Sequence, residues 1–304
     1  MDTPLISILM STYNETTKEL DESINSILHQ TYSNFEFLII NDNPNNYALE
    51  KKLKSYKDSR IKIIHNEKNL GLVKSLNSGL KCCNGQYVAR MDADDISCPS
   101  RIQDELLYLQ NNHLDMVGSY IETIDENGKT IKSLMRFPIN HNQIVKFMRW
   151  GSCICHPTWL LKREVCFELQ GYRKTPHCED YDFILRAIAH GYKVGNIPKV
   201  ELSYRIRQSG VSKSHEAEQF LLRDYLAKNM KQIDSLTEDA ITKFLNSEKF
   251  NWQLEQLSHY KNAKQLLKNG SGIEKLKSTV QIPINRFFWR DIVEKTTLLL
   301  REHI

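Results

Sequence analysis

The chain has 304 residues, 40% hydrophobic and 26% charged, which is typical of a globular protein rather than a disordered chain or a membrane bundle. Its formal net charge of +4 is too small to indicate a nucleic-acid partner. No basic segment precedes the apolar run 5–10, and no run reaches the ~18 apolar residues of a membrane span, so we expect a cytoplasmic protein.

The first half alternates short apolar runs with helical patterns, which is typical of βαβ units on a mainly parallel sheet. Strands are predicted at residues 5–13, 35–41, 61–65 and 86–91, and helices at 18–29, 47–56 and 72–82. Polar clusters at 41–46 and 92–95 follow the second and fourth strands. Open α/β sheets bind ligands at this edge, so the two clusters are candidate site residues.

The second half is mixed and then helical. Runs 115–123 and 129–137 flank Asp-Glu-Asn-Gly, which predicts a hairpin. A helix is predicted at 142–150, a strand at 158–161 and a helix from about 179 to 190. From residue 212 onward the pattern is helical only, so we place a boundary near 210–214.

A basic stretch lies inside this helical region. Residues 249–290 hold eight Lys or Arg against two acids, interleaved with aromatic residues. This pattern suits contact with an anionic membrane surface or a lipid-linked acceptor. It suits equally a solvated helical face whose aromatic side chains pack on the catalytic domain or on a second subunit.

The seven cysteines form no Cys-x-x-Cys pair, so they are predicted to be reduced thiols, and cysteine-based zinc binding is not expected. Neither a phosphate-binding P-loop nor a Gly-x-Gly-x-x-Gly motif occurs, so ATPase and dehydrogenase functions have no support.

Two acidic motifs carry the chemical interpretation. Asp92-Ala93-Asp94-Asp95 places three carboxylates directly after an apolar strand, where they repel unless a cation lies between them. Mg²⁺ and Mn²⁺ bind one or two carboxylates together with substrate phosphates, so a metal–diphosphate site is predicted. The alternative is a solvated turn in which Asp95 caps the next helix.

The second motif, Glu179-Asp180-Tyr181-Asp182, opens a predicted helix. Acids at a helix start are favoured by the helix dipole, so simple capping is the alternative to a catalytic role.

These motifs resemble, in order and spacing, those of family 2 glycosyltransferases that build capsules and lipopolysaccharide. The resemblance covers about residues 4–212 and rests on STYNE, FEFLIIND, VARMDADD, HPTWLLKREV, CEDYD and YRIRQSGVS. It implies a GT-A fold, which is a Rossmann-like, mainly parallel nucleotide-binding sheet flanked by helices. Residues 1–212 would form this catalytic domain, with a nucleotide-sugar half at 1–98 and an acceptor half at 99–212. Residues 213–304 would form a helical C-terminal region.

The resemblance also implies site residues. Tyr13 would contact the base, Asp42 would hydrogen-bond uracil, Asp92 would contact ribose, and Asp94 would bind Mn²⁺ or Mg²⁺. The nucleotide-binding set is completed by further residues of the same loops and of the helix after Asn-Leu-Gly: Thr12, Asn14, Lys74 and Ala93.

On the acceptor side, Asp180 would be the catalytic base and Glu179 its companion, which contacts the acceptor or orients the loop. His156, Arg205 and Arg207 are candidates for acceptor or phosphate contact, although His156 is more simply explained as a histidine satisfied within the fold. Arg207 stands where many relatives have histidine, and Asn41 stands where they have an acid.

The predicted function is inverting transfer of a hexose or N-acetylhexosamine from a nucleotide-diphosphate sugar, here a UDP-sugar. The acceptor would be a glycan or lipid-linked saccharide of surface polysaccharide synthesis, at the inner face of the cytoplasmic membrane. Two alternatives stay open. A sugar nucleotidyltransferase usually has a glycine-rich loop where this chain has STYNETTK, and a non-catalytic homologue usually loses the carboxylates that are present here.

Overall fold

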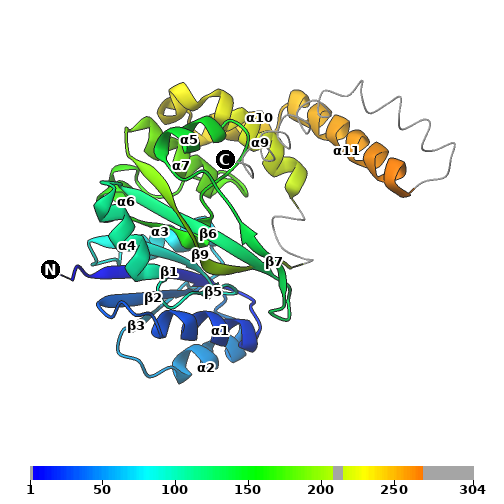
Figure 1. Ribbon diagram of the computed structural model, residues 1–304. Coiled ribbons are helices and arrows are strands. Elements are labelled where there is room, and N and C mark those ends of the chain that lie inside the picture. The colour runs from blue at the N-terminus through cyan, green and yellow to red at the C-terminus, as the bar shows by residue number, and fades with distance from the viewer. Residues whose placement is uncertain (1–2, 208–214, 270–304) are drawn as a thin grey trace. The chain divides into compact units, whose positions relative to one another are not determined.

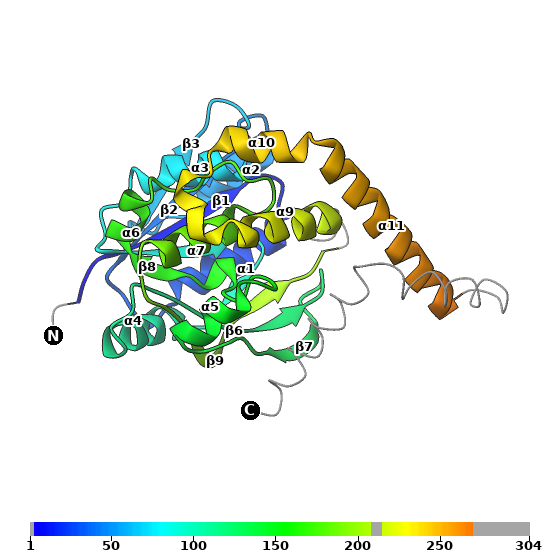
Figure 2. The ribbon, with the colours of Figure 1, turned by 90° about the horizontal axis from the view of Figure 1, so that it is seen from above.

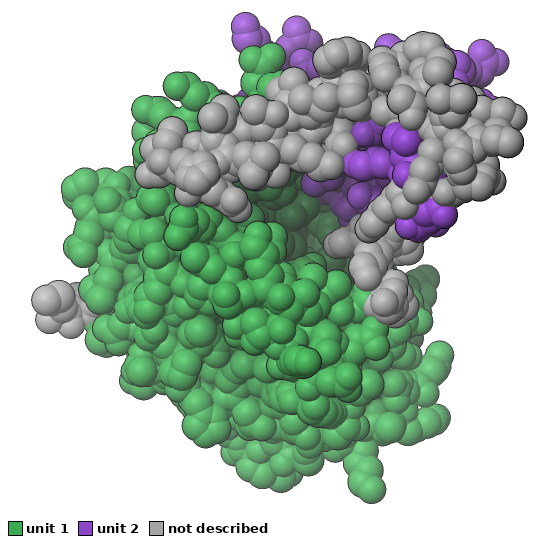
Figure 3. Space-filling model, turned by 45° about the vertical axis from the view of Figure 1, so that its right-hand side comes forward, with its two compact units in different colours: residues 1–175, 179–210 green, residues 176–178, 211–304 purple. Residues whose placement is uncertain are grey.

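The computed structural model describes residues 3–207 and 215–269. The chain divides into two compact units, which Figure 3 shows in different colours. Residues 1–175 and 179–210 form the first unit, and residues 176–178 and 211–304 form the second. Each unit is described by itself below.

The first unit contains one sheet, to which nine strands of the described chain contribute (Figure 1). Its parallel half has the order β3-β2-β1-β4, formed by β1 (Ile6–Thr12), β2 (Phe35–Asn41), β3 (Ile61–His65) and β4 (Tyr87–Asp92). The sheet continues through β8 (Leu160–Lys162), β6 (Met116–Ile124), β9 (Val194–Arg205) and β5 (Ile96–Ser97). Strand β7 (Thr130–Met135) pairs with β6 and completes the predicted hairpin.

Helices lie on both faces of this sheet (Figures 1 and 2). They are α1 (Thr17–Leu28), α2 (Tyr47–Ser55), α3 (Leu72–Leu80), α4 (Arg101–Asn111), α5 (His141–Phe147), α6 (Arg163–Glu168) and α7 (Glu179–Ala189), with a 3₁₀ turn, η1, at His156–Thr158. Alternate residues of β1 face opposite sides of the sheet. Ile8 and Met10 pack on one side, with apolar residues of α1, α2 and α4. Leu9 points the other way, and a Cβ on Gly79 of α3 would lie 2.3 Å from its Cδ1.

The predicted strands and helices of the first half are confirmed to within a few residues, and the fold is the predicted mainly parallel α/β sheet. Two local expectations were wrong or incomplete. Residue 158, predicted as the start of a strand, is instead the last residue of the 3₁₀ turn η1, whose second residue is Pro157. The long strand β9 was not predicted, and it contains Pro198 where its pairing with β6 is irregular.

The second unit is helical over its described part. It contains α9 (Glu216–Lys228), the 3₁₀ helix η2 (Met230–Ser235), α10 (Glu238–Leu245) and α11 (Glu248–Asn269). Its core gathers Leu221, Phe250, Leu257, Tyr260 and Ala263. The rings of Tyr225 and Phe244 stack with centroids 3.9 Å apart.

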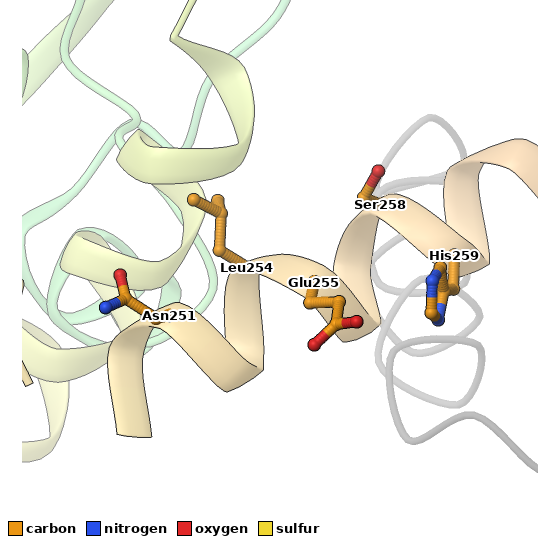
Figure 4. A pocket seen from close by; sticks show the side chains of 5 residues that line it. All are labelled: Asn251, Leu254, Glu255, Ser258 and His259. Carbon is orange, nitrogen blue, oxygen red and sulfur yellow. The ribbon is translucent and has the colours of Figure 1, made fainter. Parts of the chain in front are cut away.

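None of the helices in the described ranges is long and apolar enough to cross a membrane. The basic stretch 249–290 belongs to α11 as far as Asn269, and its remainder lies outside the described residues. Contact of this stretch with a membrane therefore stays a prediction. A shallow hollow on α11, shown in Figure 4, is lined by Asn251, Leu254, Glu255, Ser258 and His259, none of which was predicted as a site residue.

Replacing Asp182 by alanine is expected to destabilise the first unit by about 3–5 kcal/mol, because a buried charge pair would lose its anion. Asp182 is fully buried on α7, and its carboxylate accepts hydrogen bonds from Arg173 and from Arg186 Nε at 2.8 Å. Urea unfolding followed by circular dichroism measures the effect. Asp104→Ala, which removes an exposed pair with Lys199, should cost no more than about 1 kcal/mol. Equal losses in the two variants would contradict this interpretation.

Candidate active site

The candidate site lies where β1, β2 and β4 end. Thr12 pairs in register with Asn41, and Ser11 pairs with Asp92, so the three strands finish side by side. The residues that follow them, including Tyr13, Asp42 and Asp94, therefore lie at one edge of the sheet, as predicted from the polar clusters.

The loop after β1 presents an aromatic face. Glu15 accepts hydrogen bonds from Thr12 Oγ1 at 2.6 Å and from the Tyr13 backbone N–H at 2.8 Å. Asn43 Nδ2 donates to the Tyr13 carbonyl at 2.8 Å, which ties this loop to the end of β2. The Tyr13 side chain is 42% exposed and Asn14 is exposed, so the backbone is held while the ring is open to a ligand.

Asp42 is buried and holds the next loop. Its Oδ1 accepts from Asn66 Nδ2 at 2.7 Å and from the Leu70 N–H at 2.8 Å, and its Oδ2 accepts from the Gly71 N–H at 2.9 Å. A uracil imide would have to use the second lone pair of Oδ2. Lys74, on the helix that starts at this loop, is exposed and forms no ion pair within the described residues.

The three carboxylates after β4 differ sharply in their surroundings. Asp92 is about one-third exposed and forms an ion pair with the buried Arg90. Burial and the charge of Asp92 raise the pKa of Asp94 to about 7, against the opposing effect of Arg207. Asp95 is 1% exposed, and burial together with Asp94 raises its pKa well above the usual range.

Two arginines of the YRIR motif contact this cluster in different ways. Arg205 is buried, and its guanidinium donates to the carbonyls of Asp94, Asp125 and Glu126 and pairs with Glu22 at 2.6 Å. Arg205 therefore has a structural role, because its guanidinium N–H groups are already bonded to oxygen atoms of the protein. Arg207 is partly exposed, and its Nε lies 3.0 Å from the Asp94 carboxylate, so it is less enclosed than Arg205.

The residues fit the divalent cation that the fold family implies. Asp95 Oδ2 is buried and has no hydrogen-bond partner among the described residues. Burial, and then the charge of neighbouring carboxylates, raises the pKa values of Asp94 and Asp95. Asp92 and Asp94 are the partly exposed carboxylates of the cluster, and both are hard oxygen donors. They would hold Mg²⁺ or Mn²⁺ together with substrate phosphates, while Arg207 already supplies one positive charge beside Asp94.

The second acidic motif meets the first. Glu179 and Asp180 open α7, both are partly buried, and Asp180 Oδ1 accepts from the Tyr181 N–H at 2.7 Å. Burial and the charge of Asp180 raise the pKa of Glu179 to about 7, and the charges of Arg90 and Asp92 also act on it. Two motifs far apart in the sequence therefore converge around Arg90.

His156 lies in an aromatic cluster next to this point. Its Nε2 is 2.8 Å from the Tyr172 hydroxyl, and its ring packs against Trp159 with centroids 4.4 Å apart. Burial and the charge of Arg90 lower its pKa well below the usual range, so the ring is neutral at pH 7. This geometry agrees with a histidine satisfied within the fold.

Sequence reasoning missed the supporting residues. Arg90 forms the ion pair with Asp92, and its only sequence signal is a charge inside the apolar strand YVARMD. The clamp formed by Arg173, Asp182 and Arg186 was also missed, although the four-residue spacing of Asp182 and Arg186 on a predicted helix is a signal for that pair. Arg186 donates to the carbonyls of Leu169 and Gly171, so the clamp fixes the loop before α7.

A mainly parallel sheet with two acidic motifs near one edge is the arrangement that the resemblance to GT-A glycosyltransferases implies. Residues 7–169 match the model of glycosyl transferase family 2, and the chain belongs to this family. The O-antigen biosynthesis glycosyltransferase WbnJ of Escherichia coli is 37% identical over 233 residues, which cover 74% of this chain and 90% of that protein.

A second relative and one solved structure are also informative. The Escherichia coli UDP-Glc:α-D-GlcNAc-diphosphoundecaprenol β-1,3-glucosyltransferase WfgD is 35% identical over 147 residues, which cover 48% of this chain and 57% of that protein. The mannosyltransferase PcManGT of Pyrobaculum calidifontis, solved with GDP-mannose and Mn²⁺, shares the fold with a TM-score of 0.60 and 15% identity. The similarity covers 97% of this chain and 85% of that one. The chain is thus a GT-A glycosyltransferase of a family that acts in polysaccharide biosynthesis.

Proposed function

We propose that this enzyme transfers a sugar from a UDP-sugar to a glycan or lipid-linked saccharide, with inversion of the anomeric carbon and with help from a divalent cation. The observation that carries the proposal is that the two acidic motifs meet: Arg90 forms an ion pair with Asp92, and the charges of both act on Glu179, next to Asp180. One group of acids can serve the donor diphosphate, and the other can serve the acceptor hydroxyl.

On the donor side, the open Tyr13 ring offers a stacking surface for the base, and Asp42 offers an acceptor for the imide N–H. Asp92, at the end of β4, would contact the ribose. Lys74 and Arg207 are the cations open to phosphate, because both are exposed or partly exposed. Ala93 packs its side chain into the apolar core, so it would contribute only its backbone to the nucleotide site.

A divalent cation, when bound, neutralises the diphosphate and stabilises it as a leaving group. Asp94 and Asp92 would hold it, as argued above. Arg207 Nε lies 3.0 Å from Asp94 and Nη2 lies 3.1 Å from Glu19, and both nitrogens are buried, so a phosphate oxygen would meet this guanidinium at its remaining nitrogen.

On the acceptor side, Asp180 is the proposed base. A carboxylate within hydrogen-bond reach of a hydroxyl can take its proton during attack on the anomeric carbon. Attack from the face opposite the leaving diphosphate inverts the configuration. Glu179 lies beside Asp180, and its raised pKa of about 7 suits a hydrogen bond to the acceptor or to the loop.

The relatives support the polysaccharide setting. WbnJ is an O-antigen enzyme, and the name of WfgD gives a UDP-sugar donor, a lipid-diphosphate acceptor and a β-linked product. The Mn²⁺ in the PcManGT structure supports a cation in this fold, although that protein carries GDP-mannose.

A donor screen tests the proposal. Hydrolysis of UDP-, GDP- and dTDP-sugars by the purified enzyme is measured with Mn²⁺ or Mg²⁺ and then with chelator. We expect release of UDP from one UDP-hexose or UDP-N-acetylhexosamine, at least about tenfold faster with metal. Release of GDP or dTDP alone would contradict the donor assignment, and equal rates in chelator would contradict the role of the cation.

A further inference from the structure

Three metal-ligating side chains lie together in the second unit, and none of them belongs to the acidic motifs described above. His177 comes from the short segment 176–178, His215 precedes α9, and Glu218 lies in its first turn. One ligand atom from each lies within 4.8 Å of the other two. Over residues 3–207 and 215–269, no other group of three His, Cys, Asp or Glu side chains meets this spacing.

The side chains already face one another. The rings of His177 and His215 stack with centroids 3.9 Å apart and planes 15° apart. His215 Nδ1 lies 2.9 Å from Glu218 Oε2, and the two residues share one side of the chain because they are three apart at a helix start. The three ligand atoms are close together and the residues are partly exposed, so an ion can reach them from solvent. Because the two rings stack face to face, one imidazole would turn on binding so that both ring nitrogens point at the ion.

The backbone at His177 is an independent observation. His177 has a φ of 59°, in the left-handed region that non-glycine residues seldom adopt. Such a conformation persists only where surrounding contacts hold it. The next residue, Cys178, is buried, and its Sγ lies 3.6 Å from the Gln219 carbonyl. The segment 176–178 is thus held against the first turns of α9 in a strained turn that brings the two imidazoles together.

We propose that His177, His215 and Glu218 bind one transition-metal dication of the zinc class, with water in the remaining position. Imidazole nitrogens suit Zn²⁺, Co²⁺ and Ni²⁺, whereas Mg²⁺ and Mn²⁺ prefer oxygen ligands. Two histidines and one glutamate are an established ligand set for tetrahedral zinc with one open position. The site differs in ligand chemistry from the all-carboxylate cluster around Asp94.

The bound ion would close a loop from His177 to His215 and fasten the start of α9 to the segment 176–178. This segment enters α7 directly, because Glu179 follows His177 by two residues in the chain. The site is therefore a structural clip, and its expected effect is on the stability of the second unit rather than on the chemical step.

The test uses the full-length chain, freed of metal with chelator. Zn²⁺ is titrated by calorimetry, and Co²⁺ is titrated by visible absorption, which reports tetrahedral coordination. We expect one tight equivalent of Zn²⁺, a rise in melting temperature on binding, and an intense tetrahedral Co²⁺ spectrum. His215→Ala and Glu218→Gln should each weaken binding at least about tenfold, whereas His259→Ala on α11 should bind Zn²⁺ normally.

Three outcomes would overturn the proposal: no tight equivalent, unchanged affinity in His215→Ala, or loss of that equivalent in Asp94→Asn, which would assign the ion to the acidic cluster. Glu218→Gln changes a partly exposed side chain without changing its shape, and circular dichroism checks that it folds. The proposal does not rest on the transferase assignment, because Zn²⁺ affinity is measured without donor or acceptor.

Discussion

Replacing Asp180 by asparagine is expected to lower turnover by roughly 10²–10⁴-fold, the range typical of losing a general base. The variant keeps the shape of the side chain and its Oδ1, which accepts from the Tyr181 N–H. It removes the ability to take a proton from the acceptor hydroxyl. Affinity for UDP, measured by calorimetry with Mn²⁺, should change little, because Asp180 is proposed to act on the acceptor side.

Glu179→Gln is the matched control for this prediction. It lies on the same turn of α7 and also removes a charge, yet it should reduce turnover less because Glu179 is proposed as a companion. Near-normal turnover in Asp180→Asn would eliminate Asp180 as the base. A larger loss in Glu179→Gln than in Asp180→Asn would transfer that role to Glu179.

The second large effect is expected at Asp94. Asp94→Asn should lower transfer by about 10²-fold or more, because loss of a cation that stabilises a leaving group costs several kcal/mol and each 1.36 kcal/mol is tenfold in rate. Stimulation by Mn²⁺ should disappear in this variant. The rate is measured with saturating UDP-sugar, in metal and in chelator.

Asp58→Asn provides the control, since Asp58 lies near the start of β3, at the opposite edge of the sheet, and pairs with Arg60. Its transfer rate and its response to metal should match those of the unmodified enzyme. Full activity of Asp94→Asn in chelator would contradict the cation assignment. In that case Arg207, which pairs with Asp94, would be the positive charge that stabilises the diphosphate.

The parallel half of the fold could be predicted because its strands are short, apolar and bounded by clear polar turns. The hairpin of β6 and β7 followed from Asp-Glu-Asn-Gly, and Gly128 indeed has a φ of 89°. Strand β9 could not be predicted in the same way, because Pro198 interrupts it. The fold tolerates this proline at the place where the register of β6 and β9 shifts between Ser119 and Tyr120.

The acidic residues of the site could be predicted from the sequence, but the residues that hold them in place could not. Asp92 and Glu179 belong to local motifs that a sequence displays directly. Arg90 acquires its role only in the folded chain, where its charge and that of Asp92 act on Glu179. The clamp of Arg173 on Asp182 depends on how the loop before α7 folds back. Such long-range pairs have no spacing rule. Asp42 likewise gave no sign that it holds the loop at Leu70 and Gly71.

The configuration of the transferred sugar tests the account most directly. The enzyme is run to completion with an α-linked UDP-sugar, Mn²⁺ and a lipid-diphosphate saccharide acceptor, and the new anomeric centre is assigned by NMR. Direct attack on the anomeric carbon with Asp180 as base predicts a β-linked product. An α-linked product would contradict inversion and with it the roles proposed for Asp180 and Glu179.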